Sequence, residues 1–300
     1  MENTGVDASH ITEWRDYRFK WGHRTYVMGI INVTPDSFSG DGLDRDIERI
    51  IASAVHMAVY GADIIDIGGE STRPTSVYPD AKPVPAEEEI ARVVPVIKLL
   101  AKIINVPISI DTHKAEVARQ ALDAGASMVN DVWGGSKDPE MASLVANSGV
   151  PFIIMHNQEN TVYTDLIPDM INSLEALAES ALMAGVKKEN IIIDPGIGFG
   201  KTWAQNLVIM QRLSDFKTLG FPILIGTSRK SFIGRVLDLP VDDRMEGTAA
   251  TVALSIAGGA DIVRVHDVKE MVRVCRMADA IVRGSITPIP AKDLLKSGLA

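Results

Sequence analysis

Residues 107–131, PISIDTHKAEVARQALDAGASMVND, contain one complete unit of the pattern that decides the fold. A short apolar run ends on Asp111, a helical segment follows over about 114–124, and a second apolar run ends on Asn130-Asp131. Short continuous apolar runs are typical of strands in a parallel sheet that helices cover on both faces. The stretch therefore predicts a strand, a helix and a second strand.

The same unit recurs along the whole chain. Apolar runs end at about residues 31, 67, 110, 129, 155, 193, 227 and 264. Helical patterns lie at about 44–60, 86–104, 114–124, 138–148, 165–184, 203–219, 242–258 and 267–284. Strands that alternate with helices in this number predict an α/β fold, a single (β/α)8 barrel of the TIM type. In that fold the carboxyl ends of the strands form the active-site face, so the polar residues that end each run become the candidate site.

The barrel is expected to occupy residues 25–285 as one domain, followed by a loose tail over 286–300. Residues 1–24 form an N-terminal extension without the apolar segment of a signal peptide or membrane anchor. Phe19 and Trp21 alternate with Lys20 and Gly22, which predicts a strand and a turn that close the bottom of the barrel.

Composition narrows the class of partner. Thirty basic and 39 acidic residues give a net charge of -9, which disfavours nucleic acids and anionic membranes. No stretch approaches the roughly 20 apolar residues of a membrane helix. The single cysteine, Cys275, lies in an apolar helical pattern, which predicts a thiol in the core and a reducing, cytoplasmic location.

Three loops carry groups suited to anions, namely 32–39, 70–74 and 228–232. Each combines hydroxyls with an amide or with cations. One such loop alone is more typical of solvated polarity, but three on one barrel face favour an anionic substrate. The loop over 70–86 is long and rich in proline, which also favours a functional role.

The segment 194–202 is similar to a phosphate-binding loop but does not match one. A Walker motif requires glycine where Pro195 stands, and Lys201 takes the last glycine position of the dinucleotide motif. We therefore expect the glycines to form a tight turn that directs Phe199 at the pocket.

Asp111, Asn130, Asp194 and Lys230 are expected on different strand ends around one mouth. Carboxylates and an amide suit the donor and acceptor edge of a heterocycle, and a lysine suits its carbonyl oxygen. The alternative that Asp111 and Asp194 only cap helices or bind loop backbone remains open.

His156 and His266 lack the paired spacing of a zinc site, so a zinc centre is not favoured. The sequence also contains no pairing of a serine or cysteine nucleophile with a base, so covalent catalysis is not predicted.

The chain resembles the dihydropteroate synthase family from about residue 25 to 284. The segments that carry the resemblance occur in the family's order: Asn32–Ser39, Gly69–Pro74, Ile110–Thr112, Asn130-Asp131, Met155-His156, Asp194–Lys201 and Ser228–Phe232. The resemblance implies a transferase of folate biosynthesis that forms a C–N bond. It would join 6-hydroxymethyl-7,8-dihydropterin diphosphate to 4-aminobenzoate and release diphosphate.

The resemblance also implies three subsites, catalytic residues, Mg²⁺ and a homodimer. The pterin subsite would comprise Asp111, Asn130, Asp194, Lys230, Met155 and Val132. The diphosphate subsite would comprise Asn32, Thr72, Arg73, Arg264 and His266, with Asn32 near Mg²⁺. The aminobenzoate subsite, which is also the sulfonamide target, would comprise Phe38, Thr72, Pro74, Phe199 and Ser231. Asp111, Lys230, Asn32 and Arg73 are the expected catalytic residues.

The chemistry of the implied reaction agrees with this inventory. An aniline nitrogen is a poor nucleophile, so departure of diphosphate before amine attack is expected, and the negative charges of Asp111 and Asp194 suit the resulting pterin cation.

Two departures from the family pattern, Asn157–Asn160 and Thr75-Ser76, affect loops over the mouth. Two competing interpretations remain. One is a methyltransferase that acts on a methylated folate with a corrinoid partner, and the other is a noncatalytic pterin-binding module. Neither function requires the three loops suited to anions to be intact.

Overall fold

Eight parallel strands form the centre of the molecule in a computed structural model that describes residues 11–33, 43–70 and 83–285. They are β3 (Tyr26–Asn32), β4 (Ile64–Gly68), β5 (Ile108–Asp111), β6 (Met128–Asp131), β7 (Phe152–Met155), β8 (Ile191–Asp194), β9 (Leu224–Ile225) and β10 (Ile262–Val265). The strands are hydrogen-bonded in the order β8-β7-β6-β5-β4-β3-β10-β9, and a bridge between Ile193 and Ile223 joins the two ends. The prediction of a single (β/α)8 barrel is confirmed.

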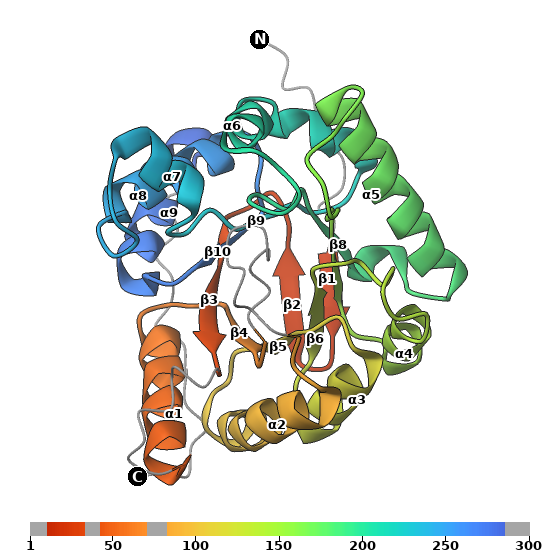
Figure 1. The fold of residues 1–300 in the computed structure, drawn as a ribbon. Coiled ribbons are helices and arrows are strands. Elements are labelled where there is room, and N and C mark those ends of the chain that lie inside the picture. Colours follow the sequence, from red (N-terminus) through yellow and green to blue (C-terminus); the bar gives the residue numbers. More distant parts are fainter. Residues whose placement is uncertain (1–10, 34–42, 71–82, 286–300) are drawn as a thin grey trace.

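Helices surround this barrel (Figure 1). They are α1 (Leu43–Val59), α2 (Ala86–Ile103), α3 (Ala115–Ala124), α4 (Met141–Ser148), α5 (Leu166–Met183), α6 (Trp203–Gln211), α7 (Ser231–Leu237), α8 (Met245–Ala257) and α9 (Val268–Val282), with short 3-10 helices at Lys188–Asn190 and Leu213–Leu219. Across the described ranges, none of these helices combines the length and apolarity needed to cross a membrane.

Two helix predictions were wrong in detail. The single helix expected over 203–219 is interrupted at Arg212, whose backbone angles of φ −108° and ψ 21° are not helical, and continues as a 3-10 helix. Arg212 pairs with Asp215 at 2.6 Å, a three-residue spacing that suits the tighter helix. Helix α7 was not predicted, because seven residues are too few for a clear apolar period.

The apolar side chains form two clusters, one between strands and helices and one inside the barrel. Strand β4 contributes to both, because successive side chains point to opposite faces. Ile65 and Ile67 belong to the outer cluster, whereas Ile64 belongs to the inner one. Asp66 follows Ile64 on the inner side, nearer the carboxyl end, and it is fully buried.

The inner cluster is covered at the amino-terminal ends of the strands by the N-terminal segment. Residues 11–20 form an antiparallel hairpin of β1 (Ile11–Trp14) and β2 (Tyr17–Lys20), drawn in red within the barrel outline in Figure 1. Phe19 stacks on Tyr26 of β3 with ring centroids 4.2 Å apart. The hairpin therefore covers the end of the barrel opposite the predicted site.

Cys275 lies in the outer of the two apolar clusters. It is a free thiol on α9, 3% exposed, and burial raises its pKa. The expectation of a core thiol is confirmed.

Candidate active site

The residues predicted to bind substrate stand at the carboxyl ends of the barrel strands. They are Asn32 at the end of β3, Asp111 at the end of β5, Asn130 in β6, Met155 at the end of β7, Asp194 at the end of β8 and Arg264 in β10. Asp111 stands opposite Asn130 in the strand register, and Met155 stands opposite Asp194. The barrel thus brings residues from distant parts of the sequence to one end.

A buried charged network occupies the side of this end formed by β4, β5, β6 and β10. Arg264 donates from Nε to Oδ2 of Asp66 at 2.6 Å and from Nη2 to Oδ2 of Asp111 at 2.7 Å. Asn130 donates from Nδ2 to the same Asp66 oxygen at 3.1 Å. One guanidinium and one amide are therefore held by two carboxylates.

Asp66 was not predicted as a site residue. The sequence interpretation assigned the end of its strand to Gly68, Gly69 and Glu70, and passed over an acid that lies within the apolar run. A charged residue inside an otherwise apolar run was the available signal, because a buried charge needs a partner. The partner, Arg264, is 198 residues away along the chain.

The carboxyl group of Asp111 has a raised pKa. Burial raises the pKa of its carboxyl to about 7, Arg264 opposes this shift, and Asp66 adds to it. Oδ1 of Asp111 and Oδ1 of Asp66 are buried, and neither has a hydrogen-bond partner among the described residues. Oδ1 of Asp111, at the end of its strand, can accept an N–H group from a ligand, because a buried acceptor without a donor is costly.

Asp194 and Lys230 form the other side of the mouth. Oδ1 of Asp194 accepts from the backbone N–H of Gly196 at 2.7 Å, and burial raises its pKa against the opposing charge of Lys230. Lys230 donates to the carbonyl of Ile197, and its ammonium lies 4.7 Å from the ring centroid of Phe199. Burial lowers the pKa of Lys230 to about 8.

The glycine-rich turn between Asp194 and Lys201 is fastened to the end of β7. Lys201 donates from Nζ to the carbonyl oxygen of Phe199 at 2.7 Å and contacts Nδ1 of His156 at 3.0 Å. Burial lowers the pKa of His156 to about 3, so its ring is neutral and Nδ1 can accept. The sequence predicted no partner for Lys201, which ends one of the segments that carry the family resemblance, so its contact with His156 was not predicted.

The groups expected to bind diphosphate make internal contacts here. Nδ1 of His266 lies 2.9 Å from Oγ of Ser228. Arg229, from the loop assigned to anions, instead forms an ion pair with Asp267 at 2.5 Å. Arg264 retains 21% side-chain exposure beside its two carboxylates.

The remaining expected site residues, which come from all three subsites, are only partly described. Ser231 is exposed at the first turn of α7, Phe199 is half-buried, and Val132 is buried just after β6. Phe38, Thr72, Arg73 and Pro74 lie outside the described residues.

Glu70 marks the base of the second loop. Its Oε1 accepts from the backbone N–H of Val84 at 3.2 Å, and its Oε2 accepts from Lys114 at 2.5 Å. Lys114 also donates to buried Glu89 at 2.6 Å. Glu70 thus links the end of the described segment before 71–82 to the start of the segment after it.

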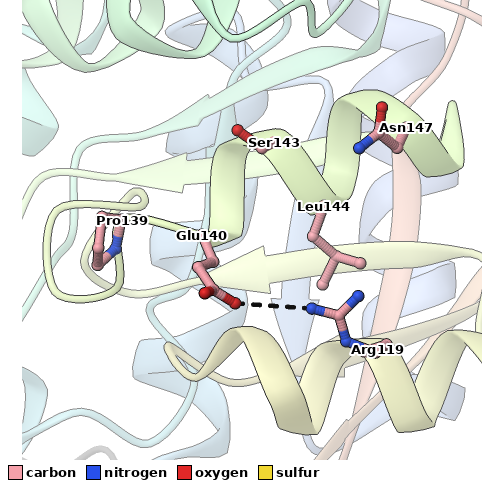
Figure 2. A pocket seen from close by; sticks show the side chains of 6 residues that line it. All are labelled: Arg119, Pro139, Glu140, Ser143, Leu144 and Asn147. Carbon is pink, nitrogen blue, oxygen red and sulfur yellow. Dashed lines mark ion pairs between the residues drawn. The ribbon is translucent and has the colours of Figure 1, made fainter.

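Within the described ranges, no group of three or more His, Cys, Asp and Glu side chains is arranged to hold a metal ion. A hollow of about 300 Å³ lies outside the barrel between α3 and α4, where Arg119 faces Glu140 at 3.6 Å (Figure 2). Its lining residues come from α3, α4 and the segment before α4 and include none of the predicted site residues, so it is not the candidate site.

Comparison with known proteins agrees with the barrel and its polar mouth. Residues 28–266 match a family described as pterin binding enzyme. The dihydropteroate synthase of Bacillus subtilis is 50% identical over 282 residues, covering 94% of this chain and 97% of that protein. The chain belongs to the pterin-binding enzymes.

Solved structures that are similar to this chain identify one family within the pterin-binding enzymes. A Clostridium difficile dihydropteroate synthase, crystallised with pteroic acid, is 51% identical with a TM-score of 0.85, covering 88% of this chain and 99% of that one. A Xanthomonas albilineans dihydropteroate synthase with 4-aminobenzoic acid is 39% identical, also with a TM-score of 0.85, covering 91% and 98%. Within the pterin-binding enzymes, the chain belongs to the dihydropteroate synthase family.

Proposed function

We propose that this protein condenses 6-hydroxymethyl-7,8-dihydropterin diphosphate with 4-aminobenzoate, giving 7,8-dihydropteroate and diphosphate. The observation that carries the proposal is the set of buried acids, Asp66, Asp111 and Asp194, that face cations and an amide at one end of the barrel. Such a set suits a heterocycle rich in N–H donors. The relatives crystallised with pteroic acid and 4-aminobenzoic acid support the same pair of substrates.

The pterin binds against the strand ends. Asp111 and Asp194 accept its N–H groups, Lys230 faces its carbonyl oxygen, and Asn130 completes the polar edge. Met155 and Val132, which are 3% and 6% exposed, contribute apolar surface beside it. Burial of both carboxylates supports this arrangement, and a ligand would supply the donor that Oδ1 of Asp111 lacks among the described residues.

The reaction proceeds by departure of diphosphate before attack. The bond between the pterin methylene carbon and the ester oxygen breaks, and diphosphate leaves with the electron pair. The amine nitrogen then donates its lone pair to the cationic methylene, a C–N bond forms, and the nitrogen loses one proton to water. Asp111 and Asp194 stabilise the intermediate cation electrostatically. No covalent bond to the protein is required.

Diphosphate binds above Arg264 and His266, together with Asn32, Thr72 and Arg73. Mg²⁺ fits this subsite, because Mg²⁺ commonly takes few protein ligands and completes its shell with substrate phosphates and water. The carboxamide of Asn32, at the end of β3, would hold it. When bound, the ion neutralises charge on the leaving diphosphate.

The aminobenzoate subsite comprises Phe199 and Ser231 with Phe38, Thr72 and Pro74. Phe199 offers a ring that Lys230 already contacts, which suits an aromatic acid. A sulfonamide of similar shape would compete for this subsite.

The protein acts as a homodimer in the cytoplasm. Exposed apolar side chains on α7, α8 and α9 support the dimer: Val236, Leu237, Leu254, Met277, Ile281 and Val282. The buried free thiol of Cys275 is compatible with a reducing compartment.

The test is a diphosphate-release assay with and without 4-aminobenzoate. A synthase releases diphosphate and forms dihydropteroate in equal amounts when both substrates are present. A methyltransferase or a noncatalytic binding module forms no dihydropteroate, and that outcome would overturn the proposal.

A further inference from the structure

Asp66 holds two residues of the candidate site through one oxygen. Its Oδ2 accepts from Nε of Arg264 at 2.6 Å and from Nδ2 of Asn130 at 3.1 Å. The side chain is fully buried on the inner face of β4, below the strand ends. Asp66 therefore lies beneath the residues that would meet substrate.

The bond to Asn130 determines how the amide is presented. Because Nδ2 donates downward to Asp66, the amide oxygen is turned away from that carboxylate and is available as an acceptor. Without Asp66, the amide could rotate and exchange its oxygen and nitrogen.

The bond to Arg264 determines the plane of the guanidinium. Nε is held by Asp66 and Nη2 by Asp111, so two donors on the same guanidinium are occupied by two acids from adjacent strands. The cation is therefore fixed between the expected pterin and diphosphate subsites. Its remaining donors are oriented rather than mobile.

We propose that Asp66 is a positioning residue that fixes Arg264 and Asn130 in the orientation needed for the pterin diphosphate. The inference rests on the proposed function above. Stability alone does not account for the arrangement, because apolar residues can replace a buried ion pair without loss of stability. Branched apolar side chains usually fill this level of a barrel interior.

The first measurement compares Asp66→Asn with the wild-type protein. The shape is retained while the charge is lost, so kcat/KM for the pterin diphosphate should fall roughly 10- to 100-fold. Calorimetry should show roughly tenfold weaker binding of the alcohol, 6-hydroxymethyl-7,8-dihydropterin, because Asn130 is no longer fixed. Unchanged values for both ligands in a folded variant would overturn the proposal.

Asp63→Asn is the matched control. Asp63 is also buried and pairs with an arginine, Arg24, at 2.6 Å, but it lies just before the amino-terminal end of β4. This control should lower the melting temperature and leave kcat/KM and alcohol affinity unchanged. If Asp63→Asn reproduces the kinetic losses of Asp66→Asn, the role of Asp66 is merely structural.

A double-mutant cycle separates positioning from direct action. In an Arg264→Ala background, Asp66→Asn should lower kcat/KM for the diphosphate substrate by a smaller factor than in the wild-type background, because only the contact with Asn130 remains to be lost. An equal loss in both backgrounds would show that Asp66 does not act through Arg264. Asp66→Glu, which keeps the charge but displaces it, should also lose activity and replaces Asp66→Asn if that variant does not fold.

The outcomes also distinguish this inference from the proposed function. If the wild-type protein forms no dihydropteroate, the proposed reaction is wrong. The calorimetric comparison with the alcohol still decides the role of Asp66, and absence of pterin binding by the wild-type protein would overturn both.

Discussion

Lys201 and His156 form a buried contact, with Nζ of the lysine 3.0 Å from Nδ1 of the imidazole. The same ammonium donates to the backbone carbonyl of Phe199 at 2.7 Å. One side chain thus joins the end of β7 to the turn that follows β8. Because Phe199 lies on that turn, the contact helps to position the ring proposed to bind 4-aminobenzoate.

Lys201→Met should loosen this turn. The substitution leaves the carbonyl of Phe199 without its donor, so the free energy of unfolding should fall by about 1–3 kcal/mol. KM for 4-aminobenzoate should rise roughly tenfold, and KM for the pterin diphosphate should change less. Steady-state kinetics and urea denaturation measure both effects. Lys188→Met, at an exposed lysine, serves as the control, and an unchanged aminobenzoate KM in Lys201→Met would contradict the assignment.

The pH dependence of the reaction should report the ionisation of Asp111. Its pKa is raised to about 7, and the ionised form is the one that stabilises a cation. As pH rises through 7 the negative form accumulates, so kcat/KM for the pterin diphosphate should increase across that range. Asp111→Asn should remove this limb of the profile.

A variant at Arg264 tests the same assignment of the pH dependence to Asp111. Its charge lowers the pKa of Asp111, so Arg264→Ala should move the limb to higher pH. A profile that is identical in the wild type and both variants would assign the ionisation to the substrates instead.

Gly196→Ala should damage the site through the backbone. Gly196 has φ +72°, and an added Cβ would stand 2.1 Å from the carbonyl oxygen of His156. We expect a loss of at least about 2–3 kcal/mol in stability from the left-handed conformation and the overlap together, with a fall in turnover.

Gly149→Ala separates these two causes. Gly149 has φ +64° but no atom within 4 Å of an added Cβ. Its replacement should cost only about 1–2 kcal/mol and leave kinetics unchanged. Thermal melts and assays of the two variants side by side would refute the argument if they lost equal stability and equal activity.

The substrates should bind in order. Asp111, Asn130 and Asp194 stand on strands, whereas Phe38, Thr72 and Pro74 belong to Gly-, Ser- and Pro-containing segments of the sequence. We therefore expect the aminobenzoate subsite to be completed only after pterin and diphosphate bind. Calorimetry should detect weak sulfonamide binding to the free protein and tight binding with diphosphate and Mg²⁺ present. Equally tight binding without them would mean that the subsite is preformed.

The fold was predictable because its signal is local. Each apolar run is followed by a polar residue. Because the carboxyl ends of parallel barrel strands lie on one face, these polar residues come together there. Asp111, Asn130 and Asp194 were predicted as site residues in this way, and the structure places them at the carboxyl-terminal part of β5, β6 and β8. Asp66 was missed because it stands inside a run, and Lys201 because its partner His156 is 45 residues away. Helix α7 was missed because it is too short for a period to show.

The sequence by itself determined the eight strands, the end of the barrel at which the candidate site lies, and the residue types available there. Short-range periodicity is enough for this, since side-chain alternation and strand ends depend only on neighbours along the chain. Only the tertiary structure decided which charges meet. Arg264 pairs with Asp66 and Asp111 rather than standing apart, and Arg229 pairs with Asp267. These partners depend on barrel closure and on the cost of burying a charge without a counter-charge, and neither is encoded in any local stretch of residues.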